Sequence, residues 1–189
     1  MRTRLTFRAG FMALAMAVAV TFPLTGCARR TFDVKVVETV PSDEIGPATS
    51  AGRLSVRFAP MWDEDWQLET LDANAAMAGV LPVRSEIENT SGETVRMRDV
   101  RIVALDGHGR AWKQIDFKKA RKRIEKFYGV RLRNREGDRE YRADFEANAL
   151  DARSDLPAGG RRQGLLYFEM PSDVRRQVPV TIVAADERR

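Results

Sequence analysis

The chain has 189 residues, of which 43% are hydrophobic and 31% charged, with a formal net charge of +5, one Cys and one His. Without residues 1–26, which hold three Arg and no acid, 29 basic and 27 acidic residues remain, a balance that argues against nucleic acid as a partner. Residues 27–189 are enough for one domain with its own core, and a single Cys allows no internal disulfide.

The first residues have the layout of a secretory signal peptide. Arg2, Arg4 and Arg8 precede an uncharged, mostly apolar run over residues 9–22, which ends at Pro23. An uncleaved membrane helix is the alternative, but the run is shorter than the roughly 20 residues that a span needs. We therefore expect residues 1–26 to be removed.

Leu24, Thr25 and Gly26 precede Cys27, and this stretch resembles the lipobox of bacterial lipoproteins. The resemblance implies a lipid anchor, with palmitate-type chains on Cys27, and a location in the cell envelope. In proteobacterial lipoproteins, an Asp directly after the lipidated Cys resembles a signal for retention in the inner membrane. This chain has Ala28 at that position. The resemblance thus points to the outer membrane, facing the periplasm, if the host is Gram-negative. No apolar run of 18 or more residues follows Cys27, so the lipid is the membrane attachment that we expect.

Residues 27–52 are predicted to form a tether, because residues 41–52 are rich in Pro, Ser, Gly, Ala and Thr. The alternation over residues 32–36 allows one edge strand within this tether. Residues 53–189 are predicted to form the domain, which starts with a half-buried strand that has Leu54, Val56 and Phe58 on one face.

Two Trp residues flank three acids in the next segment. Trp62 and Trp66 are four apart, so they are predicted to share one face of a helix. Burial in the core is favoured over stacking on sugars. Asp63, Glu64 and Asp65 favour a helix start over a calcium site, because a calcium loop needs alternating oxygen ligands over a longer stretch. A short helical turn is expected at residues 73–78.

Residues 80–105 predict a β-hairpin, with turn residues at positions 89–92 and a return strand that begins at Val95. The alternation shifts by one at Asp99, which predicts a bulge or a change of sheet there. Residues 106–109 predict a second turn. His108 lies between two Gly residues, so a turn residue is favoured over a catalytic base.

Two amphipathic helices are predicted between the β portions, over about residues 113–150. Residues 113–128 place Ala120, Ile124 and Phe127 on an inward face, and residues 138–150 do the same with Tyr141, Phe145 and Leu150. The last two strands, residues 162–170 and a strand with Val178, Val180 and Ile182, are both expected at central positions.

Five short motifs resemble a family of uncharacterised bacterial lipoproteins with immunoglobulin-like extracytoplasmic domains. They are GVLPV at residues 79–83, NTSG at 89–92, LDGHG at 105–109, LPAG at 156–159 and GLLYF at 164–168. The resemblance implies a mainly β fold, an immunoglobulin-like antiparallel β-sandwich of about seven strands that carries the two-helix insertion, and it implies no activity. The predicted core comprises Val83, Ile87, Ile102, Leu165, Phe168, Val180 and Ile182.

The helical insertion separates charge. Residues 113–135 hold ten basic and two acidic residues, so the rest of the chain after residue 26 sums to about −6. The candidate docking surface for anionic lipid, an acidic envelope polymer or an envelope protein comprises Lys118, Lys119, Lys122, Arg123 and Lys126. The alternative is that these cations pair internally with Glu136, Asp138 and Glu140, as weak surface salt bridges.

One His and no free thiol offer little for hydrolytic catalysis or for a metal centre, and no phosphate loop or cofactor motif is present. The sequence therefore favours a non-enzymatic interaction or structural module, without cofactor or metal. A hydrolase of envelope polymers that uses carboxylates of the helical insertion, and a small-ligand carrier with an apolar cavity, are the alternatives.

Overall fold

The computed structural model describes residues 32–129, 135–174 and 177–186. The predicted signal peptide, with Leu24, Thr25 and Gly26, and the predicted lipid site Cys27 lie outside these residues. The helices are α1 (Glu64–Leu71), α2 (Phe117–Phe127), α3 (Arg135–Ala147) and the short 3-10 turns η1 (Ser42–Ile45) and η2 (Met97–Asp99). The strands are β1 (Thr49–Ala51), β2 (Leu54–Pro60), β3 (Val80–Asn89), β4 (Val100–Asp106), β5 (Ala111–Ile115), β6 (Arg161–Glu169) and β7 (Val180–Asp186).

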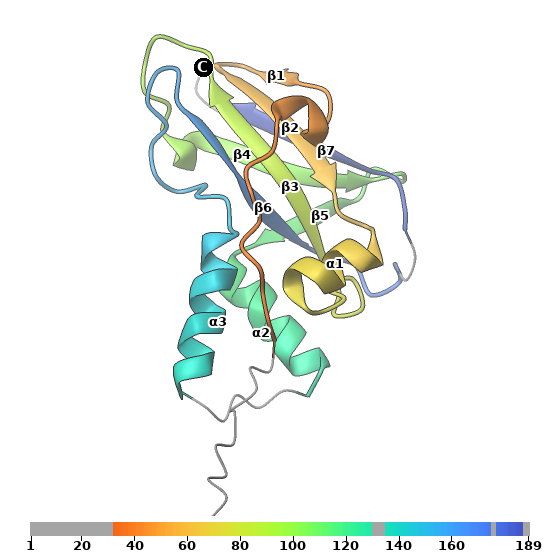
Figure 1. Cartoon of the computed structure of the whole chain (residues 1–189). Helices are drawn as coiled ribbons and strands as arrows, with labels where there is room; N and C mark the ends of the chain where they lie inside the picture. Colours follow the sequence, from red (N-terminus) through yellow and green to blue (C-terminus); the bar gives the residue numbers. More distant parts are fainter. Residues whose placement is uncertain (1–31, 130–134, 175–176, 187–189) are drawn as a thin grey trace, which may run out of the picture.

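The seven strands form a sheet in the order β1-β2-β3-β6-β5-β4-β7, in which all neighbours are antiparallel. Its two ends, β1 and β7, are in contact, so the sheet curls into a nearly closed, barrel-like wall (Figure 1). The predicted mainly antiparallel β fold is confirmed. The two-layer immunoglobulin-like sandwich stays a prediction.

The predicted hairpin over residues 80–105 is wrong, because β3 pairs with β2 and β6 and not with β4. The turn residue Asn89 explains the difference. Its side-chain amide donates to the carbonyls of Glu93, Leu156 and Pro157 at 2.7–3.0 Å. Val95 then bridges to Leu156, so the chain leaves β3 toward a distant loop and enters β4 through η2, where the alternation shifts.

Strand β6 separates two hydrophobic cores, which explains why its sequence is apolar on both faces. Leu166 and Phe168 lie in the inner core of the barrel, whereas Leu165 and Tyr167 lie in an outer core under the helices. The predicted central position of β6 is confirmed by its place between β3 and β5. The same prediction is wrong for the last strand, because β7 ends the strand order.

The other predicted core residues lie as follows. The inner core holds Val83, Ile87 and Ile102, and the partly buried Val180 and Ile182 pack against it. The predicted inward side chains Ala120, Ile124, Tyr141 and Phe145 are buried in the outer core.

The three helices gather at one end of the barrel, which we call the helical end (Figure 1). Helix α2 begins at Phe117 rather than at residue 113, because residues 111–115 form β5 and Asp116 accepts a hydrogen bond from the Lys119 N–H at 2.8 Å as the N-cap. Leu150 lies beyond α3 in the inner core. Phe127, predicted to face inward, is 49% exposed.

Helix α1 starts where the acids predict, with the Asp63 carboxylate accepting from the Trp66 N–H at 2.7 Å. The two Trp do not share a helix face, because Trp62 precedes the helix. Trp62 packs on the inner core with its ring 6.2 Å from that of Trp112, whereas Trp66 packs on the outer core below Arg84. Both Trp side chains are thus partly buried against a core. Residues 73–78 form turns rather than a helix.

Residues 32–40 form an N-terminal strap along the domain rather than part of a free tether or an edge strand. Phe32 and Val34 are buried in the outer core. The Val37 N–H donates to the Asn148 side chain at 2.6 Å, and Val40 exchanges two hydrogen bonds with the Gln163 amide. Side-chain amides thus satisfy backbone groups that a neighbouring strand would otherwise pair. Residues 32–40 therefore pack against the domain that was predicted to start at residue 53.

Candidate functional site

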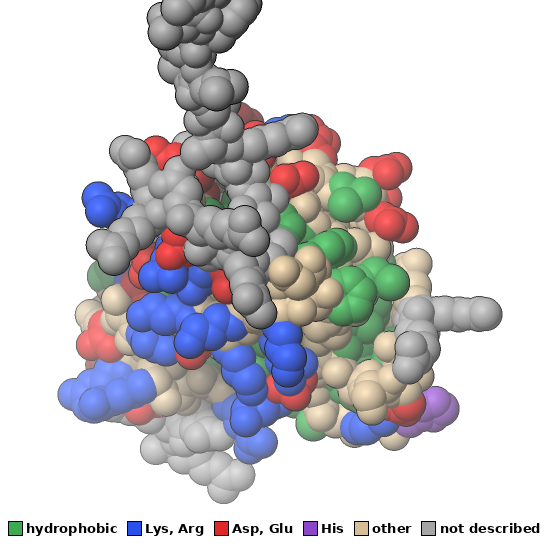
Figure 2. All heavy atoms as spheres, turned by 90° about the horizontal axis from the view of Figure 1, so that it is seen from below, with side chains coloured by type: hydrophobic (Ala, Val, Ile, Leu, Met, Phe, Trp, Pro, Cys, Tyr) green, Lys and Arg blue, Asp and Glu red, His purple; other side chains and the backbone are tan. Residues whose placement is uncertain are grey.

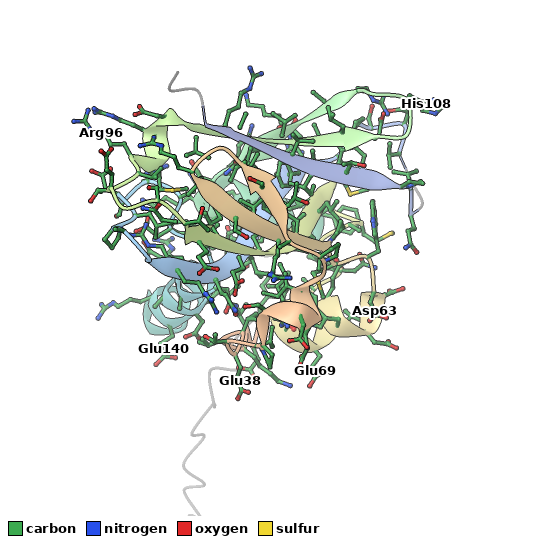
Figure 3. The ribbon with its side chains drawn as sticks, turned by 90° about the horizontal axis from the view of Figure 1, so that it is seen from above. Glu38, Asp63, Glu69, Arg96, His108 and Glu140 are labelled. Carbon is green, nitrogen blue, oxygen red and sulfur yellow. The ribbon has the colours of Figure 1, made fainter. Side chains whose placement is uncertain are left out.

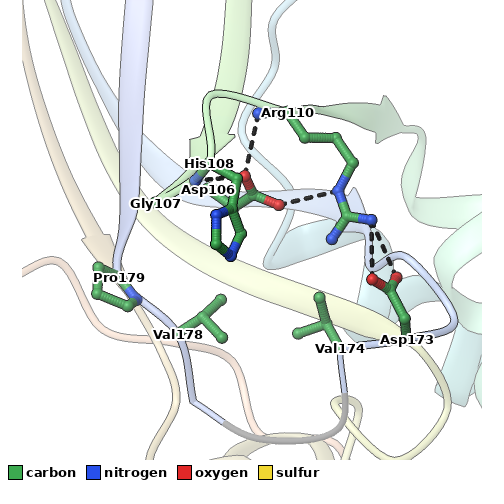
Figure 4. Close-up of a pocket in the computed structure, with 8 residues that line it drawn as sticks. All are labelled: Asp106, Gly107, His108, Arg110, Asp173, Val174, Val178 and Pro179. Carbon is green, nitrogen blue, oxygen red and sulfur yellow. Dashed lines mark hydrogen bonds and ion pairs between the residues drawn. The ribbon is translucent and has the colours of Figure 1, made fainter.

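A pocket of about 580 Å³ lies beside the turn between β4 and β5 (Figure 4). His108, which was predicted to be a residue of this turn, is one of the residues that line the pocket. The Asp106 carboxylate accepts from the N–H groups of His108 and Arg110 at 3.0 Å, from the Arg110 guanidinium at 2.9 Å and from the Trp112 indole at 3.2 Å. Arg110 also donates to both carboxylate oxygens of Asp173 at 3.0 Å. The charged groups that border the pocket are therefore already bound to one another, with Arg110 shared by two carboxylates.

The hydrogen bonds that Asp106 accepts favour its ionised form. Desolvation opposes its charge, but the hydrogen bonds from the Arg110 backbone, the Trp112 indole, the Arg110 side chain and the His108 backbone outweigh it and lower the pKa of Asp106 to about 2. A carboxylate with such a pKa stays charged at neutral pH and cannot deliver a proton. The arrangement closes the turn, in agreement with the prediction that His108 is a turn residue.

The hydrolase alternative requires carboxylates that converge in a hollow, and one cavity of about 550 Å³ is lined by Asp116, Glu146 and Asp151. Two of these three are engaged in local structure. Asp116 caps α2, and Asp151 accepts from the N–H groups of Arg153 and Ser154 at 3.0 and 3.1 Å. These hydrogen bonds to Ser154 and Arg153 lower the pKa of Asp151 to about 2, so Glu146 is the one lining acid without such a role.

Four further acids lie on the outer surface and do not converge in a pocket. Figure 3 shows Glu38, Asp63, Glu69 and Glu140 spaced along one side of the molecule with their side chains directed outward. In the described part of the chain, no group of three or more His, Cys, Asp or Glu side chains could hold a metal ion.

The predicted docking residues on α2 divide into two groups. Lys119 and Arg123 both bind Glu169 at the end of β6, at 3.2 and 2.5 Å. Although partial burial opposes ionisation of Glu169, these two cations hold the pKa of that carboxyl below its usual range. Lys119 and Arg123 therefore attach α2 to the sheet. They form internal salt bridges, as the salt-bridge alternative predicted, but their partner is Glu169 and not one of the acids that it named.

Lys118, Lys122 and Lys126 make up the second group, which we call the lysine stripe. They follow one another at intervals of four, on the side of α2 opposite the buried Ala120. All three are exposed, and none has a carboxylate partner within salt-bridge distance among the described residues. In Figure 2, which shows the helical end from below, Lys and Arg side chains gather on one part of this face, beside a group of hydrophobic side chains.

An internal charge cluster fixes α2 to α3, and it includes Asp138, one of the partners that the salt-bridge alternative named. Arg121 is buried, binds Glu125 and lies 3.8 Å from Asp138. Its guanidinium also lies 5.8 Å from the ring centroid of Tyr141. Like Lys119 and Arg123, Arg121 is thus structural, and helical periodicity alone gave no signal for a buried Arg.

Exposed apolar side chains meet at the C-terminal end of α2. Met77 and Phe127 are 63% and 49% exposed, and both line a hollow of about 780 Å³ that Trp62 and Arg123 also border. The Tyr128 hydroxyl accepts a hydrogen bond from the Asn74 N–H at 2.9 Å and so joins the α2 end to the turn that holds Met77.

The same end of α2 contacts the start of the strap. The Tyr128 ring lies 5.1 Å from the Phe127 ring and 5.9 Å from the Phe32 ring, with edge-to-face geometry in both pairs. Phe32 also stacks on Tyr141 of α3 at 5.4 Å. The described chain therefore starts at the helical end, next to the exposed Phe127.

These features define a small, mainly β domain with a cationic and partly apolar helical end. Within the ranges that the structure describes, no helix is both long and apolar enough to cross a membrane. No family model matches the chain, and no curated protein matches it. Among solved structures it is similar to a conserved hypothetical protein from Bacillus anthracis, with 10% identity, 75% of this chain and 89% of that chain covered, and a TM-score of 0.41. A likeness at this level bears on neither function nor mechanism.

Proposed function

We propose that the chain is a lipid-anchored protein of the cell envelope whose domain acts as a non-enzymatic interaction or structural module close to the membrane. The signal-peptide layout and the lipobox residues Leu24, Thr25, Gly26 and Cys27 support the anchor. In this proposal two or more acyl chains on Cys27 give firm attachment.

The observation that carries the proposal is the place where the strap begins. Phe32 is buried between Tyr128 and Tyr141 at the helical end. Cys27 is five residues upstream, and a fully extended chain spans at most roughly 3.6 Å per residue, or about 18 Å. A lipid on Cys27 would therefore hold the helical end near the bilayer surface, with the opposite end of the barrel directed away.

The immunoglobulin-like sandwich is part of the same proposal. Two of the motifs that carry the family resemblance, NTSG at residues 89–92 and LPAG at residues 156–159, contact each other through Asn89 and the carbonyls of Leu156 and Pro157. This contact gives both motifs a structural role, which supports a resemblance in fold rather than in activity. We expect crystallography to show the strands in two packed sheets, and a continuous barrel wall would contradict the sandwich.

The location that we propose is the outer membrane, facing the periplasm, if the host is Gram-negative, because Ala28 and not Asp follows Cys27. Separation of inner and outer membranes, followed by detection of the protein, tests this step. Recovery with the inner membrane would contradict it.

Hydrolysis of an envelope polymer is the competing function, and the cavity beside Asp116, Glu146 and Asp151 is the observation in its favour. The cap formed by Asp116 and the backbone hydrogen bonds that Asp151 accepts leave Glu146 without a second free carboxylate, and glycoside hydrolysis needs a pair. This asymmetry favours the non-enzymatic module. An apolar carrier cavity has less support, since each of the three cavities described above is bordered by charged groups.

The anchor is tested by Cys27→Ser in the full chain expressed in cells given labelled palmitate. We expect the unchanged protein to be shortened and labelled, and the variant to stay unlabelled and full length. Thr25→Ser serves as a matched control inside the lipobox and should be processed normally. A Cys27→Ser protein that is still labelled and shortened would disprove the anchor. Crosslinking in intact cells then identifies the partner of the anchored module.

A further inference from the structure

The exposed side of α2 runs from Lys118 in the first turn to Phe127 at the C-terminal end, and together with Met77 it forms a surface that we call the α2 tip: Met77, Lys118, Lys122, Lys126 and Phe127. Its three Lys side chains are exposed and lack a carboxylate partner among the described residues. The acids nearest in sequence are occupied, because Asp116 caps the helix and Glu125 binds Arg121. The stripe therefore presents positive charge to its surroundings.

Phe127 and Met77 supply the apolar component. A Phe that is about half exposed and a Met that is more exposed still line one hollow beside this charge. Lys residues flanking aromatic and aliphatic side chains are the composition of surfaces that lie at the boundary between headgroups and acyl chains. An internal salt-bridge network among the described residues explains neither these Lys residues nor the exposed Phe127.

The start of the strap decides which partner meets this surface. Phe127 is joined to Phe32 through the Tyr128 ring, and Phe32 is within about 18 Å of a lipid on Cys27. A domain held by so short a link exposes the α2 tip to the bilayer to which it is anchored. Anionic headgroups complement the Lys side chains, and their potential extends about 8 Å at physiological ionic strength.

We infer that the α2 tip docks on the surface of an anionic phospholipid bilayer, with Lys118, Lys122 and Lys126 at the headgroups and Phe127 and Met77 inserted at the interface. This inference names the partner of the helical end and rests on the proposed lipid anchor for its orientation. The affinity itself resides in the domain, so it is measurable without the lipid.

The experiment uses a chain that begins at Ala28, which keeps both hydrophobic cores and every hydrogen bond of the strap. This protein is sedimented with phosphatidylcholine vesicles that contain or lack phosphatidylglycerol, at low and at physiological salt. We expect binding that requires phosphatidylglycerol and weakens as salt rises. Replacement of the three Lys by Gln should weaken it about a hundredfold, at roughly fivefold for each charge.

Matched controls separate this surface from general effects. Arg96, Arg98 and Arg101 are exposed residues around the start of β4, toward the end of the barrel opposite the helices, and their triple replacement by Gln removes the same charge. Phe127→Gln should weaken binding about fivefold, since the side chain is half exposed before docking. Val183→Gln on the barrel wall, where Val183 is 43% exposed, should leave binding unchanged.

Each result of these binding measurements either supports or overturns the docking. Loss of binding in the Lys and Phe127 variants, with the Arg and Val183 controls unaffected, supports docking. Absence of vesicle binding in the parent, equal losses in the controls, or binding to acidic cell-wall polymer without binding to vesicles overturns it. Because the palmitate test on Cys27 is separate, a labelled protein that ignores vesicles refutes the docking alone, and an unlabelled protein that binds vesicles refutes the anchor alone.

Discussion

Gly164 lies in β6 at the point where the chain after α3 crosses the strand. The Leu165 N–H donates to the Asn148 carbonyl at 2.7 Å, and the Leu150 N–H donates to the Leu165 carbonyl at 3.0 Å. A Cβ added at Gly164 would lie 2.6 Å from the Leu150 nitrogen, 2.7 Å from its Cα and 3.0 Å from the Ala149 carbonyl carbon. These are backbone atoms, which cannot avoid the methyl group by a change of rotamer.

Gly164→Ala should therefore lower the free energy of unfolding by about 2–4 kcal/mol. Ordinary van der Waals contact needs 3.4–4 Å, so residues 149–150 must move outward. That movement strains two hydrogen bonds, each contributing about 1 kcal/mol, and overpacking of this kind typically costs about 1–3 kcal/mol. It also draws Leu150 out of the inner core.

Urea unfolding of the chain that begins at Ala28, followed by circular dichroism, measures this loss. Gly92→Ala is the matched control, because nothing lies within 4 Å of its added Cβ and its φ is not positive. That substitution should change stability by less than about 0.5 kcal/mol. If Gly164→Ala were as mild as the control, residues 149–150 could not lie over β6 as described.

Three further changes test the contacts of the helical end and the pocket. Asn148→Ala should cost about 2 kcal/mol and speed amide exchange at Val37, whose N–H loses its acceptor, and unchanged exchange would disprove that pairing. Arg121→Met should cost about 3 kcal/mol by leaving the partly buried Glu125 without its cation, and a second change, Glu125→Gln, should restore part of the loss; additive effects in this double-mutant cycle would argue against the ion pair. Asp106 has a pKa lowered from 3.8 to about 2, so its stabilisation is full above about pH 4 and is lost as pH falls toward 2; the stability gap to Asp106→Asn in thermal unfolding should narrow over that window, and a constant gap would contradict the assignment.

Periodicity predicted best the elements whose buried residues follow a regular spacing along the chain. Residues 162–170 read as a central strand because Leu165 and Phe168 face two different cores, and the structure places β6 there. The inward residues Ala120 and Ile124 of α2 followed from helical spacing for the same reason. Such patterns are set by burial, which the sequence records directly.

Other features depend on partners that are distant in the sequence, and local patterns contain no trace of them. The Asn89 side chain has turn chemistry that suits a hairpin, yet it bonds to carbonyls of Leu156 and Pro157 and the hairpin does not form. Residues 32–36 alternate like a strand, but the strap bonds to the amide of Asn148, more than one hundred residues later. Phe127 has inward spacing and is exposed, because periodicity gives the side of a helix and not the point at which the core ends.

A short link between the lipid and the domain lowers the affinity for the bilayer that the α2 tip needs. A domain linked by about five residues meets its own bilayer at an effective concentration near the millimolar range, so docking requires only a millimolar Kd, or about 4 kcal/mol. Lys118, Lys122 and Lys126 at about 1 kcal/mol each supply most of that, and partial burial of Phe127 supplies the remainder. The same three charges on a domain at the end of a long, flexible link would leave it undocked. The close packing of Phe32 against the helical end is therefore the structural condition under which so modest a surface can hold the domain in one orientation.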